Sequence, residues 1–415
     1  MAKAHATLLA LALFLVACAG GQPSGTDPIA PATTAPPPTS PPAMRSATTF
    51  APPSPASDSA TLAPVGPAYQ ANYNPLTGLP LDPDQQLDRT PFLVAITNFP
   101  PSSRPQTGLS LADHVWESSI AQGQTRFLAV YYGVEWNHFE GSAAQRNLPY
   151  DHLLGPVRSG RVVFEDIRSF YPGALLITRA ASPEILPELN RQFTMFNKDP
   201  QDVNSAGLTY QEILELPLKT ASAETYAGLH FDPEVPPGGV SAPDLTVIYN
   251  QYAQYSWVFE ESSQRYTRLQ APFGSDGPMS PLIDRLTGQP LQFDNLVVLF
   301  AQHKFENLAA TILEIEMRFV PERYGLLFRN GQVYEIRWSS RRNEFRLLDE
   351  AGQDFPLRPG TTFYEVVSFR STWNPETRVL RYHQPPLPTL TPSATPTPTT
   401  TPTPTRTATP TPTPP

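Results

Sequence analysis

Proline is distributed very unevenly along this chain, and that distribution decides where a folded core can form. The chain has 415 residues and 51 prolines. Residues 19–70 are mostly Pro, Ala, Thr and Ser, so they cannot bury enough apolar surface to offset the entropy of ordering. From Pro385 onward, Thr-Pro repeats favour the extended polyproline II conformation. A folded core is therefore expected only between these two segments.

The remaining length is comfortable for two domains. Proline and glycine cluster at residues 233–239, which marks a boundary. The fold class predicted is α+β, with a mixed α/β N-terminal domain and a β-rich antiparallel C-terminal domain, flanked by disordered Pro/Thr-rich segments. The predicted segments are a signal peptide (1–17), a stalk (18–70), the N-terminal domain (71–240), the C-terminal domain (241–372) and a Thr-Pro-rich tail (373–415). The tail is a spacer, a glycosylated segment or an inert solubilising end.

An apolar stretch near the start of the chain ends at its only cysteine, Cys18. Lys3 supplies a positive charge, and the run from Leu8 to Val16 is too short to span a bilayer. The sequence Leu15-Val16-Ala17-Cys18 resembles a bacterial lipobox, in which the thiol takes a diacylglyceryl group. It predicts an extracytoplasmic protein anchored to the cell membrane through lipid on Cys18. The alternative is an ordinary secretory signal.

Composition excludes several classes of function. With one cysteine, the mature chain can form no internal disulfide. A net charge of −9 argues against a general nucleic-acid binder, which needs a basic surface. The spacing of the histidines matches no zinc signature, and no dinucleotide fingerprint or Gly-x-Ser-x-Gly elbow is present. We therefore predict no metal site, no cofactor and no nucleic-acid partner.

The first half of the core contains both apolar patterns typical of strands and apolar patterns typical of helices. Residues 92–96 form a short apolar run typical of a buried strand, and residues 115–120 and 126–132 indicate a hairpin. Apolar residues at helical spacing predict a helix over 161–170, with Ser159 as a candidate N-cap. The other predicted elements are a strand at 174–178, a helix opened by Ser182-Pro183 and running to 193, and a short helix at 210–216.

The sequence of the second half predicts short strands separated by turns, a pattern that indicates an antiparallel sheet or small barrel. The expected strands are 246–249, 256–259, 296–300, 311–315 and 363–367. Asn330-Gly331 predicts a type I′ hairpin turn, because both residues tolerate the left-handed conformation. Five aromatic residues could form a face for stacking sugars, although strand alternation favours core packing. These are Tyr252, Tyr255, Trp257, Phe259 and Tyr266.

Several blocks of the first half together resemble the YerB-like lipoproteins. They are Asn74-Pro75-Leu76-Thr77-Gly78, Ala95-Ile96-Thr97-Asn98, Arg104-Pro105-Gln106-Thr107-Gly108-Leu109, Ala112-Asp113, Glu117, Thr125-Arg126-Phe127-Leu128-Ala129 and Gly155-Pro156-Val157-Arg158-Ser159. The resemblance covers most of residues 71–370. It implies a two-part fold and a lipoprotein location, but no reaction. Relatives carry Ala-Pro-His-Asn where this chain has residues 199–206 without histidine, so an activity that depends on that imidazole is not expected here.

The polar residues within these blocks are the candidate site. The candidates for ligand binding are Asn98, Arg104, Asp113, Glu117, Arg126, Arg158 and Arg161. We expect them to gather at one concave edge of the first domain, where guanidinium groups would grip a carboxylate or phosphate. The alternative is a structural network of arginines and carboxylates that pins loops to the sheet.

The sequence favours binding or scaffolding over catalysis, because no nucleophile, metal set or phosphate loop emerges. The partner would be an envelope glycan, an anionic ligand or a protein. The rival interpretation is a cell-envelope hydrolase or transferase that uses Asp113 and Glu117 as acid and base, since burial and neighbouring arginines can separate the pKa values of two carboxyls.

Overall fold

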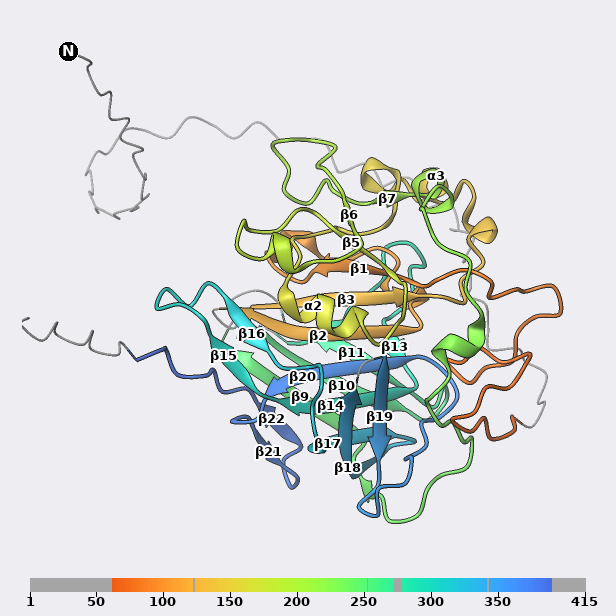
Figure 1. The fold of residues 1–415 in the computed structure, drawn as a ribbon, viewed down its shortest axis with the longest axis vertical. Helices are drawn as coiled ribbons and strands as arrows, with labels where there is room; N and C mark the ends of the chain where they lie inside the picture. Colours follow the sequence, from red (N-terminus) through yellow and green to blue (C-terminus); the bar gives the residue numbers. More distant parts are fainter. Residues whose placement is uncertain (1–61, 122–123, 252, 272–277, 342, 390–415) are drawn as a thin grey trace, which may run out of the picture. The chain divides into compact units, whose positions relative to one another are not determined.

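Two β-sheets packed face to face form the centre of the structure (Figure 1). The computed structural model describes residues 62–389 apart from 122–123, 252, 272–277 and 342, and all of them belong to one compact unit, Thr49–Pro415. The predicted signal peptide, Cys18 and most of the predicted stalk and tail lie outside the described residues. None of the helices in the described part has the length and apolar character needed to cross a bilayer.

Within the part of the chain that the structure describes, the first half contributes seven strands and three short helices. The strands are β1 (Phe92–Thr97), β2 (His114–Ala121), β3 (Gln124–Tyr131), β4 (His152–Leu154), β5 (Leu175–Thr178), β6 (Gln192–Thr194) and β7 (Leu208–Thr209). The helices are α1 (Ser142–Gln145), α2 (Val162–Arg168) and α3 (Tyr210–Leu214).

The second half is built from strands and turns. Its strands are β8 (Val240–Ser241), β9 (Asp244–Asn250), β10 (Ala253–Glu260), β11 (Arg265–Gln270), β12 (Ser280–Pro281), β13 (Gln292–Phe293), β14 (Asn295–Ala301), β15 (His303–Phe305), β16 (Leu313–Ile315), β17 (Arg323–Arg329), β18 (Gln332–Arg341), β19 (Glu344–Leu348), β20 (Thr362–Ser368), β21 (Thr372–Asn374) and β22 (Val379–Arg381). The protein is therefore β-rich.

The larger sheet takes strands from both halves of the chain. Its order is β19-β18-β17-β14-β20-β2-β3-β1-β5-β6, with β8 paired to β18. The halves join where β20 runs parallel to β2 on one side and to β14 on the other. The expectation of an antiparallel second half is therefore wrong for β20, and also for β22, which runs parallel to β9. The segment 363–367 permits either direction, because all its residues are buried and a strand buried on both faces shows no alternation of apolar and polar residues.

Local sequence signals place most of the elements correctly. The six residues of β1 are all buried, and β2 and β3 form the predicted hairpin. Helix α2 lies within the predicted helix, although its N-cap is Arg161 rather than Ser159. The turn between β17 and β18 has left-handed residues at Asn330 (φ 53°) and Gly331 (φ 70°), as type I′ geometry requires.

The smaller sheet covers one face of the larger one. Its order is β12-β11-β10-β9-β22-β21, with β13 paired to β11. Tyr255, Trp257 and Tyr266 of this sheet are at most 1% exposed and Phe259 is also buried, so these aromatic residues pack in the core. Tyr252 lies outside the described residues. Helix α2 and the β15–β16 hairpin cover the opposite face of the larger sheet with Phe164, Ile167 and Phe305.

The helix predicted over 182–193 does not form. A single turn of 3-10 helix at Leu186–Glu188 is followed by β6, which pairs with β5. Pro187 lacks the N–H that a continuing helix needs, and Arg191 adopts a positive φ of 47°. Ile185 and Leu189 are buried, whereas Phe193, at the predicted end of the helix, is exposed.

The described fold extends beyond both predicted limits. Val65, within the predicted stalk, is buried and exchanges two backbone hydrogen bonds with Phe231 at 2.8 Å each. Strands β21 and β22 lie within the predicted tail, and Leu380 and Tyr382 are buried. Val65 packs in the same core cluster as Phe231, and Leu380 and Tyr382 pack in the core between the sheets. A high proline content alone therefore overestimates the length of both ends.

The shared sheet predicts that neither half folds alone. A protease site inserted after the exposed Gly238 should be cleaved without separating the halves, because the β2–β20 ladder and the interface between the sheets both cross the cut. Size-exclusion chromatography of the cleaved protein would check this. Each half expressed alone is expected to lack a cooperative thermal transition, and two folded, non-associating halves would contradict the prediction.

Candidate functional site

A cluster of buried polar side chains lies between the two sheets. Glu117 of β2 is directly opposite Glu365 of β20, and neighbouring strands are about 4.8 Å apart. Glu117 is fully buried and Glu365 is 2% exposed. Two carboxyl groups thus share one dry interface, and one of them must be neutralised or held by a cation.

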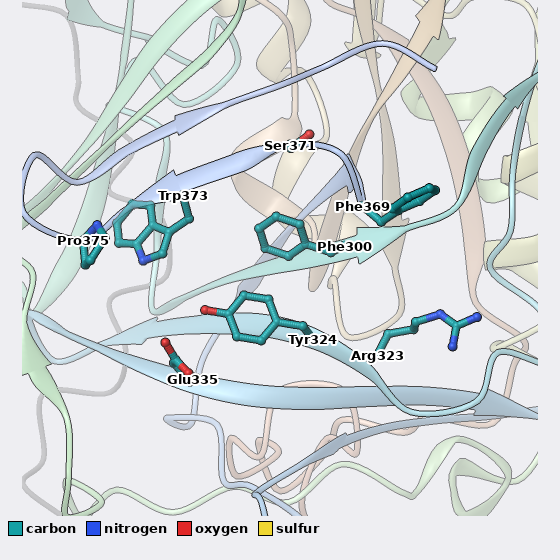
Figure 2. Close-up of a pocket in the computed structure, with 8 residues that line it drawn as sticks. All are labelled: Phe300, Arg323, Tyr324, Glu335, Phe369, Ser371, Trp373 and Pro375. Carbon is teal, nitrogen blue, oxygen red and sulfur yellow. The ribbon is translucent and has the colours of Figure 1, made fainter. Parts of the chain in front are cut away.

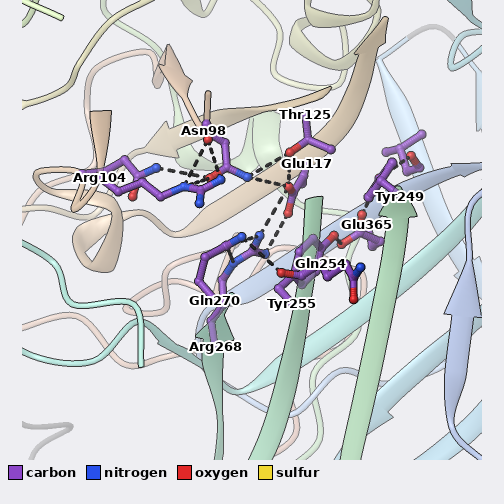
Figure 3. Close-up of polar contacts among 12 residues, drawn as sticks. Asn98, Arg104, Glu117, Thr125, Tyr249, Gln254, Tyr255, Arg268, Gln270 and Glu365 are labelled. Carbon is purple, nitrogen blue, oxygen red and sulfur yellow. Dashed lines mark hydrogen bonds and ion pairs between the residues drawn. The ribbon is translucent and has the colours of Figure 1, made fainter. Parts of the chain in front are cut away.

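The cation is Arg268, which β11 supplies from the smaller sheet (Figure 3). Its Nη1 lies 2.7 Å from Glu117 Oε2, and its Nη2 lies 3.4 Å from Oε1. Arg268 is also fully buried, with the guanidinium carbon 3.6 Å from the centre of the Tyr255 ring. Gln270 Oε1 accepts hydrogen bonds from Nε and Nη2 of Arg268. Burial lowers the pKa of Arg268, but Glu117 and Tyr255 raise it more, so the guanidinium stays charged.

Hydrogen bonds complete the surroundings of Glu117. Thr125 Oγ1 and Asn98 Nδ2 both donate to Glu117 Oε1, the latter at 3.1 Å. Arg104 does not reach the carboxylate. Its Nη2 donates to the carbonyl oxygen of Asn98 at 2.8 Å, and its Nε contacts both oxygens of Asn98. Arg104 therefore holds Asn98 in place, and burial and the positive charge of Arg268 lower the pKa of Arg104 to about 10.

Glu365 is held by two tyrosines of the smaller sheet. The hydroxyl groups of Tyr249 and Tyr255 each donate to one of its carboxyl oxygens. Burial, and then the charge of Glu117, raise the pKa of Glu365 from its ordinary 4.5 to about 8. At neutral pH, Glu365 is therefore largely protonated, which relieves the repulsion between the paired carboxyls.

Asp113 is separate from this cluster. It precedes β2, four residues from Glu117, a distance of about 13 Å along an extended chain. Its carboxylate accepts hydrogen bonds from Asn74 Nδ2 at 2.8 Å, from Tyr132 N at 2.7 Å and from Gly133 N at 3.3 Å. These contacts join the Asn74 loop to the end of β3. Burial raises the pKa of Asp113.

The remaining predicted residues lie on the other face of the larger sheet. Arg126 pairs with Ser118 across the β2–β3 ladder, whereas Glu117 pairs with Phe127. Because successive side chains of a strand point to opposite faces, Arg126 and Glu117 lie on opposite sides of the sheet. The expectation that all seven candidates gather at one edge is therefore wrong, since the register of the hairpin separates the acidic and the basic residues.

We define the arginine cluster as Arg126, Arg158, Arg161 and Arg179. Three of these donate only to backbone carbonyl groups: Arg126 Nη1 to Ser159 O at 2.6 Å, Arg158 Nη1 to Val203 O at 3.1 Å, and Arg161 Nη1 to Gly160 O at 2.8 Å. None of the ion pairs among the described residues involves any of the four.

The cluster carries buried hydrogen-bond donors without partners. The Nε atoms of Arg126, Arg158 and Arg161 are buried and make no hydrogen bond, and the same holds for Ser118 Oγ opposite Arg126. Arg126 is only 5% exposed. Burial, and then Arg161 and Arg158, lower the pKa of Arg126 well below its ordinary value, because like charges are close together with no acid to balance them.

Sequence reasoning missed Arg268, Glu365 and Tyr249, and it assigned Tyr255 to core packing without its hydrogen bond to Glu365. Glu365 interrupts the otherwise apolar and aromatic segment Phe363-Tyr364-Glu365-Val366-Val367. Arg268 lies two residues from the buried Tyr266 in β11, so both side chains point to the same face of the smaller sheet. A charge at an inward position requires a buried partner, which is the signal that could have revealed both.

Comparisons with known proteins agree with this architecture. Two family descriptions match, Protein of unknown function (DUF3048) N-terminal domain over residues 76–214 and its C-terminal domain over residues 245–364. The chain belongs to this family. It is 26% identical over 312 residues to a Bacillus subtilis (strain 168) protein named "Putative lipoprotein YerB", covering 71% of this chain and 85% of the relative. The family resemblance read from the sequence blocks is confirmed.

A solved structure has the same fold as this DUF3048 chain. The crystal structure of the YerB protein from Bacillus subtilis matches with a TM-score of 0.55 at 22% identity, covering 71% of this chain and 96% of the other. The family description assigns no activity. Among the residues that the structure describes, no group of three or more His, Cys, Asp or Glu side chains is placed to hold a metal ion.

The protonated state of Glu365 predicts a pH dependence for this DUF3048 fold. Between about pH 4.5 and pH 8, the folded state binds a proton that the unfolded state releases, so the free energy of unfolding should fall as pH rises. The slope is at most about 1.4 kcal/mol per pH unit. Glu365→Gln should remove this component, because an amide can donate to Tyr249 while the tyrosine donates to Val366 O.

Urea denaturation from pH 5 to pH 9 would measure both profiles. The difference between the wild type and Glu365→Gln is the quantity of interest, because burial lowers the pKa of His114 and His303 from 6.5 to about 4, which makes stability rise with pH up to about pH 6.5 in both proteins. Glu350→Gln, which removes an exposed carboxyl, is the matched control and should leave the profile unchanged. An equally steep profile in Glu365→Gln would mean that Glu365 is ionised in the folded protein.

Proposed function

We propose that this chain is a lipid-anchored envelope protein whose folded body binds an anionic ligand at the arginine cluster, without catalysis. The observation that carries the proposal is the buried guanidinium of Arg126, which has a free Nε and no carboxylate partner. Arginine presents a planar fork of donors that matches carboxylate and phosphate oxygens. An anion bound among these four side chains would supply the missing hydrogen bonds and relieve the repulsion between their charges.

The membrane anchor in this proposal is the lipid on Cys18. Two observations support it: the lipobox-like sequence Leu15-Val16-Ala17-Cys18, and the similarity to the Bacillus subtilis protein named "Putative lipoprotein YerB". An acyl anchor would hold the described body at the extracytoplasmic face of the cell membrane, and two chains give stable attachment where one does not. The ligand would then be an anionic component of the envelope, such as an anionic glycan or an acidic segment of a protein.

The rival function, acid–base catalysis by Asp113 and Glu117, has less support. The two carboxyls have different partners at different places along β2. Glu117 has no exposed surface and is occupied by Arg268, Thr125 and Asn98. A general acid or base must come within hydrogen-bond distance of a substrate. Both carboxyls are better explained as structural groups.

Anion binding is tested with pyrophosphate as the probe. Isothermal titration calorimetry should detect binding to the wild type, and Arg158→Ala should weaken it about tenfold or more, because each charge-assisted hydrogen bond contributes about 1.5–3 kcal/mol. Arg337→Ala removes an exposed arginine far along the sheet order on β18, and should leave the affinity unchanged. Equal affinities in the two variants would contradict the proposal.

A second variant separates a binding role from a structural one. Arg126→Met removes a buried charge that has no ionic partner, so it should abolish pyrophosphate binding while the melting temperature stays the same or rises. Added pyrophosphate should raise the melting temperature of the wild type alone. A large loss of stability in Arg126→Met would show that the arginine cluster holds the loops together instead.

Lipidation is tested in living cells by labelling with a fatty-acid analogue. The wild type should carry the label and fractionate with membranes, and Cys18→Ser should lose both properties, because no other cysteine is available. Ser24→Ala, a change nearby in the same low-complexity segment, serves as the control. Label that persists in Cys18→Ser would exclude Cys18 as the site of attachment.

A further inference from the structure

A groove lined by aromatic side chains lies beside the outer strand of the smaller sheet. Its volume is about 470 Å³, and Phe300 of β14, Tyr324 of β17 and Trp373 of β21 line it together with Phe369. Figure 2 shows these four rings around one hollow, with Glu335 and Arg323 beside them. This groove belongs neither to the polar cluster between the sheets nor to the arginine cluster.

The rings are held in place by packing, and two of them are accessible, whereas Phe300 is only 7% exposed. Phe369 is 54% exposed and Tyr324 is 36% exposed. Phe300 packs against Tyr324 with ring centres 5.2 Å apart, and the edge of Trp373 meets Phe328 at 5.7 Å. Exposed aromatic surface is normally scattered, so several rings around one hollow indicate a place where a ligand binds.

The chemistry of the groove suits a proline-rich segment. Polyproline II helices bind in grooves lined by aromatic side chains, where proline rings pack on the aromatic faces, and little entropy is lost because the helix is already extended. The Trp373 indole N–H can donate to a carbonyl group that such a helix leaves free, whereas the Tyr324 hydroxyl is hydrogen-bonded to Glu335. The carboxylate of Glu335 raises the pKa of Tyr324, after the larger effect of burial, so the hydroxyl keeps its proton.

We propose that the aromatic groove binds the chain's own Thr-Pro segment, residues 390–415. The described chain approaches the groove just before this segment begins, because His383 N donates to the Oγ of Ser371, a residue that lines the groove. The 26 residues that follow would span about 80 Å as polyproline II, so every repeat can reach back to the groove. The segment contains Arg406 and no acidic residue, which complements Glu335.

Attachment to the same chain makes weak binding sufficient. A tethered segment is present at an effective concentration of the order of millimolar, so a motif that binds only weakly as a free peptide would still occupy the groove. The bound segment would lie against the folded body and would cover the four aromatic rings.

Photo-crosslinking in the full-length chain tests the proposal. A photoreactive residue replaces Thr397, and mass spectrometry identifies where it attaches. The expected attachment is at peptides containing Tyr324, Phe369 or Trp373, with a yield that falls at least about fivefold in Phe369→Ser, since a few ring contacts supply most of the binding energy. Phe369 is more than half exposed, so this variant should keep the fold. Tyr324→Ala is the second variant.

Controls distinguish the segment from other occupants of the groove. Phe196→Ser changes an aromatic residue that is 76% exposed elsewhere and should leave the yield unchanged. The same photoreactive residue at Thr34 should not attach to the groove. Three results would overturn the proposal. One is attachment from Thr34 at an equal yield, and another is a yield that is insensitive to Phe369→Ser and Tyr324→Ala. The third is attachment that, in a mixture of isotopically distinct copies, occurs only between different copies.

Discussion

The buried ion pair between Glu117 and Arg268 constrains how the two sheets can lie on each other. Apolar faces alone can slide or rotate with little change in buried area, whereas a bidentate pair with a separation of 2.7 Å fixes one arrangement. Desolvating both charges offsets much of their attraction, so the pair contributes little net stability. Loss of one partner would nevertheless leave an unpaired charge in a dry interface, at a cost of about 3–5 kcal/mol. We infer that the pair specifies the packing of the sheets more than it strengthens it.

That constraint accounts for the state of Glu365. The parallel register of β2 and β20 places the two carboxyls opposite each other, and a single arginine can balance only one of them. The tyrosines of β9 and β10 donate hydrogen bonds that lower the pKa of the second carboxyl, but burial and the charge of Glu117 raise it more, so the protonated form has the lower free energy. The polar cluster is therefore a consequence of joining strands from both halves in one sheet.

Local signals in the sequence predicted local structure well. Turn chemistry at Asn330-Gly331 and the buried run of β1 depend only on neighbouring residues, so both could be predicted without the fold. The pairing of β2 with β20 joins residues about 250 positions apart, and the hydrophobic pattern within either strand does not predict which strand it pairs with. For the same reason, Arg268 could not be assigned to Glu117 from the sequence, and the hairpin register that separates Glu117 from Arg126 was visible only in the structure.

The polar cluster between the two sheets and the arginine cluster differ in a way that bears on function. In the cluster between the sheets, Glu117 and Arg268 make hydrogen bonds to each other and to neutral neighbours, as expected of a structural network. In the arginine cluster, three buried Nε atoms have no partner, and the nearest charges are of the same sign. A fold gains no stability from concentrating like charges without hydrogen bonds. A bound anion would balance such an arrangement, so we propose the unpaired arginines, and not the buried carboxyls, as the place where a ligand binds.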